Sequence, residues 1–347
     1  MISCLRGAGV EVVERHASLW ERRRHKWSIG IGAMLRVAVA ETILILRGHR
    51  ESFDAVIVGY PGHFDMVAAR RIARRRPVIF NPLVSLSDSL VDDRGRFTRG
   101  SAAAGVVRQI DRIAFARADV VVADTQQHAR FFAETFDLPS DRVEVCLVGA
   151  EERLFRPGWQ PRERFEALFV GKLIPLHGLE TILEAARLAP ELPFRIVGSG
   201  QLQALLDDRP ANVEWVPWVE YEELPATIQA ASCALGIFGT SEKARRVIPN
   251  KVFQALACGT PVVTSDTPAA RELLQDGESA LLVPPGDAEA LAAALRRLAG
   301  DAELTRRLAA GGLAAYKADA SEAVLGKRWR DLVERAIAVS GEAVARR

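Results

Sequence analysis

The feature that most constrains the fold of this chain is a regular alternation of short β-branched runs with longer helical patterns. In the first half, the runs lie at residues 10–14, 54–60, 77–81, 118–124 and 143–148, and the helical patterns at 64–74, 106–117 and 125–136. In the second half, the runs lie at 167–171, 194–197, 213–216, 234–238, 261–264 and 281–283, and the helical patterns at 178–189, 201–207, 222–231, 251–257 and 287–299. Such alternation is typical of βαβ units that build parallel sheets. It predicts an α/β protein with two doubly wound, Rossmann-like domains that face an interdomain cleft.

Proline and glycine at 157–158 mark the expected domain boundary. We therefore expect a first domain over 1–157, a second over 158–320, and an amphipathic C-terminal helix over 321–347 that crosses back to the first domain. A length of 347 residues suits two hydrophobic cores. Residues 7–9 read as the end of a first helix, so the run at 10–14 is read as a second strand, although no convincing first strand precedes it.

Composition narrows the class of protein. Charged residues make up 26% of the chain and the net charge is +2, so nothing in the composition suggests nucleic acid. The four cysteines are far apart and lack histidines at metal-ligand spacing, which indicates buried thiols and no metal. The start lacks the pattern of a signal peptide, and Arg36 and Glu41 interrupt the one apolar stretch, 28–46. These features favour a cytoplasmic protein.

The stretch from Gly171 to Gly178 carries the clearest chemistry. A strand ends in glycine, Lys172 follows, and a second glycine opens a helix. Backbone N–H groups and a helix dipole at such a junction can bind a phosphate. A tight turn with a solvated lysine is the alternative. Gly198 and Gly200 end the next strand, where a ligand could approach the backbone closely or the chain could simply turn.

A second group of cations precedes a helix with proline at its start. Arg246 and Lys251 lie within six residues of each other, and Gln254 follows on the same helix. Several fixed positive groups beside a helix N-terminus suit a diphosphate. The alternative is an exposed basic loop.

These motifs, together with residues 254–259, 261–263, 271–272 and 282–286, resemble retaining glycosyltransferases of family 4, which have the GT-B fold. The resemblance covers nearly all of the second domain, and the first agrees more loosely at 117–124 and 148–157. It implies transfer of a sugar, with retention, from a nucleotide diphosphate sugar such as a UDP- or GDP-sugar. The acceptor would be a glycan, a lipid-linked molecule or a small molecule, bound mainly by the first domain. No metal or other cofactor is implied.

By this resemblance, Lys172, His177, Arg246 and Lys251 hold the donor diphosphate. Two of these positions depart from the family: His177 stands where a lysine is usual, and Arg246 stands where the family has the first glutamate of a pair.

The resemblance also assigns a nucleoside site. Its residues are Gly198, Gly200, Trp218, Gln254 and Glu272. Gln254 replaces the ribose-binding glutamate of the family, and a glutamine can still hydrogen-bond a ribose hydroxyl. Trp218 is placed near the base, with a partly buried packing role as the alternative.

In the first domain, His63 follows a strand on the cleft side, and Asp65 and Asp88 fall in loops of the same kind. His63 is the candidate catalytic residue, facing the acceptor or the transferred sugar, with a capping or merely exposed histidine as the alternative. The basic run 22–26 could rest on anionic lipid at the inner face of the membrane, and ordinary helix packing is the alternative. A catalytically weak nucleotide-binding or partner-binding paralogue and a GT-B sugar-nucleotide epimerase are the alternative functions.

Overall fold

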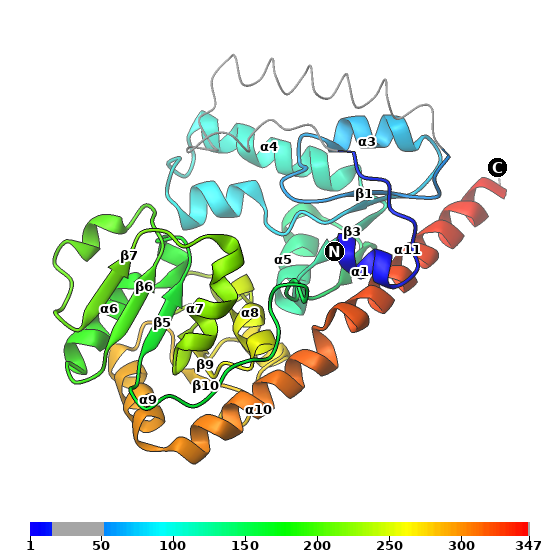
Figure 1. The fold of residues 1–347 in the computed structure, drawn as a ribbon. Helices are drawn as coiled ribbons and strands as arrows, with labels where there is room; N and C mark the ends of the chain where they lie inside the picture. The colour runs from blue at the N-terminus through cyan, green and yellow to red at the C-terminus, as the bar shows by residue number, and fades with distance from the viewer. Residues whose placement is uncertain (16–51, 346–347) are drawn as a thin grey trace.

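A computed structural model describes residues 1–15 and 52–345 of the chain. Two parallel sheets, each flanked by helices, follow one another along the sequence (Figure 1). This arrangement confirms the predicted α/β fold with two Rossmann-like domains. The expected apolar stretch at 28–46 and the basic run at 22–26 lie outside the described residues.

The first sheet contains four strands in the order β1-β2-β3-β4. Its elements are α1 (Ile2–Gly7), β1 (Val56–Val58), α3 (Met66–Ala73), β2 (Val78–Phe80), a π-helical turn (Asp88–Asp93), α4 (Ala102–Ala116), β3 (Val120–Ala123), α5 (Gln126–Phe136), a 3₁₀ turn (Ser140–Arg142) and β4 (Val143–Val145). All neighbouring strands run parallel, because a helix or loop carries the chain back after each one. The strands are short. The central strands β2 and β3 are largely buried, whereas the edge strands β1 and β4 are partly exposed. Aromatic side chains such as Phe80, Phe115 and Phe132 fill the core.

The strand expected at residues 10–14 does not form, and this prediction was wrong. The segment follows α1 without sheet pairing, and Val10 donates its backbone N–H to the carbonyl of Leu5. Val13 is exposed, so alternation of apolar and polar residues here does not reflect a buried strand face. Residue type alone suggested β structure, but a strand needs a neighbour to pair with.

The second sheet has six parallel strands in the order β10-β9-β8-β5-β6-β7. Its strands are β5 (Ala167–Val170), β6 (Phe194–Val197), β7 (Val213–Val216), β8 (Cys233–Leu235), β9 (Val262–Ser265) and β10 (Leu281–Val283), and its α-helices are α6 (Leu179–Leu188), α7 (Leu224–Ala230), α8 (Asn250–Cys258) and α9 (Ala288–Gly300). Short 3₁₀ turns lie at Pro175–His177, Gln203–Leu206, Tyr221–Glu223 and Ala270–Glu272. The strand order reverses between β5 and β8, so the carboxyl ends of these two strands form the switch point at which such sheets bind ligands.

Two long helices complete the chain. Helix α10 (Ala302–Asp319) packs on α8, and α11 (Glu322–Ala345) runs from the second domain to the first, where it packs on α1 (Figure 1). Leu325, Trp329 and Leu332 are buried on one face of α11, together with Cys4 and Leu5 of α1. This packing ties the two ends of the described chain together. The exact domain boundaries expected from the sequence stay a prediction.

The contact between α1 and α11 depends on a glycine. A Cβ at Gly326 would lie 2.5 Å from the backbone oxygen of Cys4, whereas a Cβ at Gly341, farther along the same helix, would meet nothing within 4 Å. The backbone of Cys4 cannot move aside for an added methyl group in the way that the end of a flexible side chain can. The two helices therefore require glycine at position 326.

We predict that Gly326→Ala lowers the free energy of unfolding by about 1–3 kcal/mol, since the added methyl forces α11 away from α1. The matched variant Gly341→Ala should raise it by about 0.5–1 kcal/mol, because alanine is the better helix former at an open position. Urea unfolding followed by circular dichroism measures both. Equal effects at the two positions would show that the helix contact does not limit stability.

Candidate functional site

The candidate site lies at the switch point of the second sheet, where Gly171 follows the last residue of β5. The loop that follows carries Lys172 to Gly178, and the loops after β6 and β8 press against it. A Cβ at Gly198 would lie 1.9 Å from the Gly171 carbonyl, and one at Gly200 would lie 2.6 Å from that of Leu173. These two glycines therefore let neighbouring loops touch, and they shape the site through the backbone.

Lys251 supplies the most unusual charge in this site. It lies in the first turn of α8, and its Nζ sits 3.6 Å from the centre of the Phe169 ring. The same Nζ would be 2.8 Å from a Cβ at Gly171, so the glycine is what leaves room for it. The ammonium is shielded from solvent and has no hydrogen-bond partner among the described residues, and burial holds the pKa of Lys251 well below its usual value. A charged ammonium in this position would need a counter-charge, which the described residues do not supply.

His177 lies beside Lys251 at Gly171, where a Cβ would be 3.3 Å from its ring carbon Cε1. Its Nδ1 bonds the backbone carbonyl of Lys172, and its ring packs edge-on against Phe169 with 5.6 Å between the ring centres. Burial, reinforced by Lys251, holds the pKa of His177 well below its usual range. The ring is therefore neutral near pH 7, and its Nδ1–H donates to the carbonyl. His177 shapes the loop and adds no positive charge.

The remaining cations expected at the diphosphate are placed differently. The side chain of Lys172 is exposed at the start of the loop. The guanidinium of Arg246 points toward the first domain, where it donates to Asp88 Oδ1 over 2.8 Å and lies 3.9 Å from the centre of the Phe131 ring. The backbone carbonyl of Arg246 also accepts from Thr125 Oγ1. The structure therefore brings Lys251 and His177 together but directs Arg246 into the interdomain contact.

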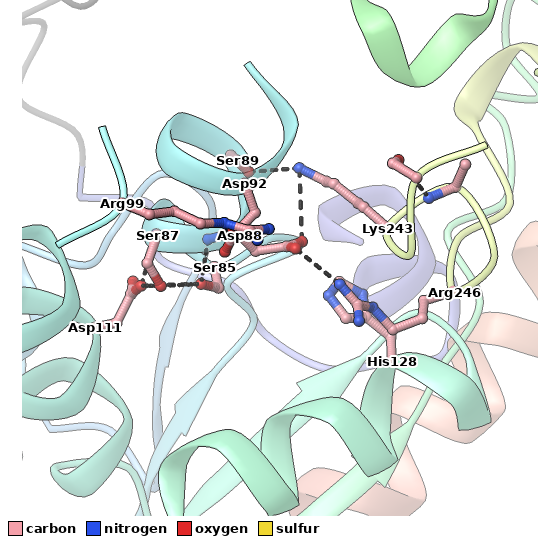
Figure 2. Close-up of polar contacts among 12 residues, drawn as sticks. Ser85, Ser87, Asp88, Ser89, Asp92, Arg99, Asp111, His128, Lys243 and Arg246 are labelled. Carbon is pink, nitrogen blue, oxygen red and sulfur yellow. Dashed lines mark hydrogen bonds and ion pairs between the residues drawn. The ribbon is translucent and has the colours of Figure 1, made fainter. Parts of the chain in front are cut away.

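Lys243 accompanies Arg246 in that contact. Its Nζ donates to Ser89 Oγ over 2.6 Å and lies 3.9 Å from Asp88 Oδ2. Figure 2 shows the Asp88 carboxylate between the two cations. Burial lowers the pKa of Lys243, and the nearby carboxylates of Asp88 and Asp93 oppose that shift.

Asp93 and Arg94 extend the same contact to the loop after β5. The Asp93 carboxyl is buried near the backbone N–H of Leu176, and burial raises its pKa against the effect of Lys243 and Arg94. Gln201 of the second domain donates to the Arg94 carbonyl over 3.2 Å. The segment Asp88–Arg94 thus reaches the second domain at several points.

Glu272 contacts the first domain rather than open space. Its two carboxylate oxygens accept from the backbone N–H groups of Gln126 and Gln127, at 2.7 and 3.1 Å. These groups begin α5, so the carboxylate caps a helix of the other domain and meets its dipole. Both oxygens are engaged, and a ribose hydroxyl would have to compete with the helix for them.

Gln254 and Trp218 lie in different surroundings. The side chains of Gln254 and Glu151 lie at the hydroxyl of Tyr221, whose pKa is raised mainly by burial. Trp218 is 68% exposed beyond the end of β7, and its indole N–H donates to Glu220 over 3.0 Å. An exposed ring of this size is available for stacking, and the partly buried packing role considered for it does not apply.

His63 does not face the cleft, and the expectation that it faces the acceptor or the sugar was wrong. It is 2% exposed, packs edge-on against Phe80 with 5.1 Å between ring centres, and lies 3.4 Å from Asp111 Oδ1. Burial lowers its pKa, with Asp111 opposing. The ring is part of the core, because the turn after β1 folds it inward. We leave His63 out of the proposed site.

Asp111 organises the loop that carries Asp88. Its carboxylate accepts the backbone N–H groups of Leu86 and Ser87 at 2.9 and 2.8 Å, and the Ser85 hydroxyl at 2.9 Å. Ser85 in turn accepts the backbone N–H of Asp88 over 3.2 Å. A fully buried carboxylate with this many donors fixes the loop, as Figure 2 shows.

Sequence reasoning missed Lys243, Asp93 and Arg94. Lys243 begins the basic run that holds Arg246, so its proximity to that cation was visible. Nothing local marked Asp93 or Arg94, whose importance comes from residues more than 80 positions away. In the part of the chain that the structure describes, no cluster of histidine, cysteine and acidic side chains could hold a metal. The described helices include none that is both long and apolar enough to cross a bilayer.

Comparison with known families agrees with this architecture. Residues 3–149 match the model of a glycosyl transferase 4-like domain, and residues 164–301 match that of glycosyl transferases group 1. The two matches correspond to the two sheets.

The curated relatives that this chain matches are also glycosyltransferases. A D-inositol 3-phosphate glycosyltransferase of Catenulispora acidiphila is 27% identical over 84% of this chain and 75% of the relative. The same enzyme name belongs to a relative from Thermomonospora curvata, 30% identical over 57% of this chain and 53% of its own length. An amylovoran biosynthesis glycosyltransferase of Erwinia amylovora is 29% identical over 48% of this chain and 44% of its own.

Solved structures share the fold at low identity. A sucrose-phosphate synthase of Thermosynechococcus elongatus superposes with a TM-score of 0.73 at 16% identity, over 92% of this chain and 83% of the other. HepE of Anabaena, solved with UDP-glucose, superposes with a TM-score of 0.68 at 16% identity, over 85% and 82%. With two family models, curated relatives and GT-B neighbours in agreement, the chain belongs to the group 1 glycosyltransferases of family 4.

Proposed function

We propose that this glycosyltransferase transfers a sugar from a UDP- or GDP-sugar to an acceptor with retention of the anomeric configuration. The observation that carries the proposal is the buried Lys251 amine at the switch point, beside Gly171 and without a hydrogen-bond partner among the described residues. A diphosphate placed there would supply the missing counter-charge. The N–H groups at the start of α8 would add to the positive field.

The same arrangement explains how the reaction would be assisted. As the bond between the sugar and the diphosphate breaks, negative charge grows on the leaving phosphate. A fixed cation shielded from water stabilises that charge strongly, because solvent does not screen it. The leaving diphosphate would then take the acceptor proton itself, so no protein base is required. This agrees with the burial of His63 away from the cleft.

We place the nucleoside contacts in the second domain, as the diphosphate contacts are. Trp218 offers an exposed ring beyond β7, and Gln254 offers an amide near Tyr221. Glu272 would contribute only after releasing α5. The acceptor, a glycan, a lipid-linked molecule or a small molecule, would approach from the first domain. We propose bacterial glycan or glycolipid synthesis in the cytoplasm or at the inner face of the membrane as the setting.

The function is tested by incubating the protein with a panel of UDP- and GDP-sugars and candidate acceptors, inositol phosphates and lipid-linked glycans included. We expect nucleoside diphosphate release that depends on the acceptor, and a product whose anomeric configuration, read by NMR, equals that of the donor. Inversion would disprove retention. An epimerised donor sugar without transfer would identify an epimerase, and nucleotide binding without turnover would identify a weak paralogue.

We predict that Lys251→Met changes affinity and stability in opposite directions. Loss of a charge-assisted contact, worth about 1.5–3 kcal/mol, should weaken nucleoside diphosphate binding about ten-fold or more. Removing a buried amine that has no hydrogen-bond partner among the described residues should raise the free energy of unfolding of the ligand-free protein. Calorimetry and urea unfolding measure the two effects.

Lys317→Met on α10 is the matched control, because Lys317 is exposed and lies outside the site. It should change neither affinity nor stability appreciably. Unchanged diphosphate affinity in Lys251→Met would remove Lys251 from the donor site.

A proton should accompany diphosphate binding. Burial lowers the pKa of Lys251 in the free protein, and a bound diphosphate favours the charged ammonium and raises it again. Affinity should therefore fall as the pH rises above the lowered pKa, since the proton must then be taken up from solvent. Calorimetry at pH 8–9 in buffers of different ionisation enthalpy should show uptake of up to about one proton, because the diphosphate is already ionised there. Lys251→Met should lose this uptake, and equal uptake in both proteins would assign the proton to another group.

A further inference from the structure

Helices α3 and α4 form one outer layer of the first domain. Both contribute to the core cluster that holds Val78, Phe80 and Val121, whereas Ile79 and Val122 pack in the other cluster. Alternate residues of a strand point to opposite faces, so the two helices cover the same face of the sheet. They are neighbours there, because α3 joins β1 to β2 and α4 joins β2 to β3. Figure 1 shows them on the side of the first domain away from α10.

The exposed side of this layer carries four arginines. Arg71 lies in the last turn of α3 and Arg75 just beyond its end, and Arg108 and Arg112 lie on α4. Within the described part of the chain, none of the four has an ion pair or a side-chain hydrogen bond. Like charges four residues apart on a helix repel each other. A negatively charged partner would relieve this repulsion.

Exposed acidic side chains are absent from both helices. The sequence of α3 contains none, and the single one on α4, Asp111, is buried and accepts the backbone N–H groups of Leu86 and Ser87. In the second domain, by contrast, Arg296 of α9 and Arg306 of α10 pair with carboxylates over 2.6 and 3.3 Å. The exposed charges of α3 and α4 are therefore all positive.

Apolar side chains are exposed beside these arginines. Phe64 lies in the turn before α3 and Val67 in its first turn, with exposed fractions of 36% and 38%, and Val106 of α4 is 57% exposed. Val67 and Arg71 are four residues apart, so they share one side of α3. At the surface of an anionic bilayer, apolar groups enter the acyl boundary while cations meet the headgroups. A nucleic acid would engage the arginines but leave the valines exposed.

We propose that this surface, which we call the α3–α4 face, docks on an anionic membrane. The face consists of the four arginines and the apolar side chains beside them, Phe64, Val67 and Val106. The inference rests on the proposed membrane setting of the transferase and names the part of the chain that makes the contact.

The position of Phe64 connects the face with the acceptor. Phe64 follows β1 at the same end of the sheet as the segments after β2 and β3, which contact the second domain through Asp88 and the start of α5. A docked membrane would therefore lie beside the first-domain side of the cleft. A lipid-linked acceptor could enter the cleft from there without leaving the bilayer, so this class of acceptor is the one that the face favours.

The test is cosedimentation of the full chain with vesicles of phosphatidylcholine alone and of phosphatidylcholine mixed with phosphatidylglycerol. We expect binding to the mixed vesicles only, and weaker binding from about 0.1 to about 1 M salt, where the Debye length falls from about 10 to about 3 Å. R71Q/R75Q/R108Q/R112Q should bind at least about ten-fold more weakly, because each arginine near an anionic surface contributes a factor of about five.

The matched control removes the same charge from the second domain. This variant is R296Q/R297Q/R306Q/R307Q, whose substitutions lie on α9 and α10, and it should bind vesicles as the wild type does. Urea unfolding checks that every variant is folded.

A third variant, F64S/V67S, tests the apolar part of the face. It should weaken vesicle binding by a similar factor at low and high salt, because burial of apolar side chains is not screened. The basic run at 22–26 is intact in every variant, so differences between them belong to the substituted residues.

Three results would overturn the proposal. They are equal binding to neutral and mixed vesicles, wild-type binding by R71Q/R75Q/R108Q/R112Q, and undiminished binding by F64S/V67S. Duplex DNA bound as tightly as mixed vesicles, and lost in the same arginine variant, would also overturn it and identify a nucleic-acid surface.

Vesicle binding is measured without donor or acceptor, so it can fail separately from the proposed function. A chain that docks on mixed vesicles but transfers no sugar from any donor would uphold the α3–α4 face and remove the proposed function. A transferase that binds no vesicle would do the reverse.

Discussion

The candidate site depends on one buried amine, Lys251 Nζ, which is enclosed beside Gly171 and against the Phe169 ring and has no hydrogen-bond partner among the described residues. An apolar side chain of similar length would fit this place at lower cost. The cation is retained at the point where the strand order reverses, which is where a doubly wound sheet binds its ligand. Geometry and charge thus point to the same site, and an anion is the group that would complete it.

A second set of charges links the domains. Asp88 accepts a hydrogen bond from Arg246 and lies near Lys243. Glu272 of the second domain caps α5 of the first. Each contact joins residues distant in sequence, and two of them use groups, Arg246 and Glu272, that the family resemblance would assign to a ligand. If Arg246 and Glu272 bind the donor as proposed, they must leave these contacts between the domains to do so.

The sequence predicted the parts of this account that depend on local pattern. The β-branched runs predicted the two parallel sheets, and the glycine and lysine at 171–172 pointed to the loop beside which Lys251 and His177 meet. The strand expected at 10–14 was wrong, because it lacks a neighbour. Arg246 lies five residues before Lys251, yet its partner Asp88 is 158 residues away, and spacing carries no signal for such a contact. Proline and glycine precede His63 and suggest an exposed loop, but the turn directs its ring into the core against Phe80. The roles of the site residues stay predictions.

The most direct test of the central claim is a crystal structure with an intact UDP- or GDP-sugar bound. We predict that a phosphate oxygen lies within hydrogen-bonding distance of Lys251 Nζ and that the diphosphate approaches the backbone at Gly171. A diphosphate bound elsewhere, with the ammonium still resting on Phe169 without an anion, would contradict the account.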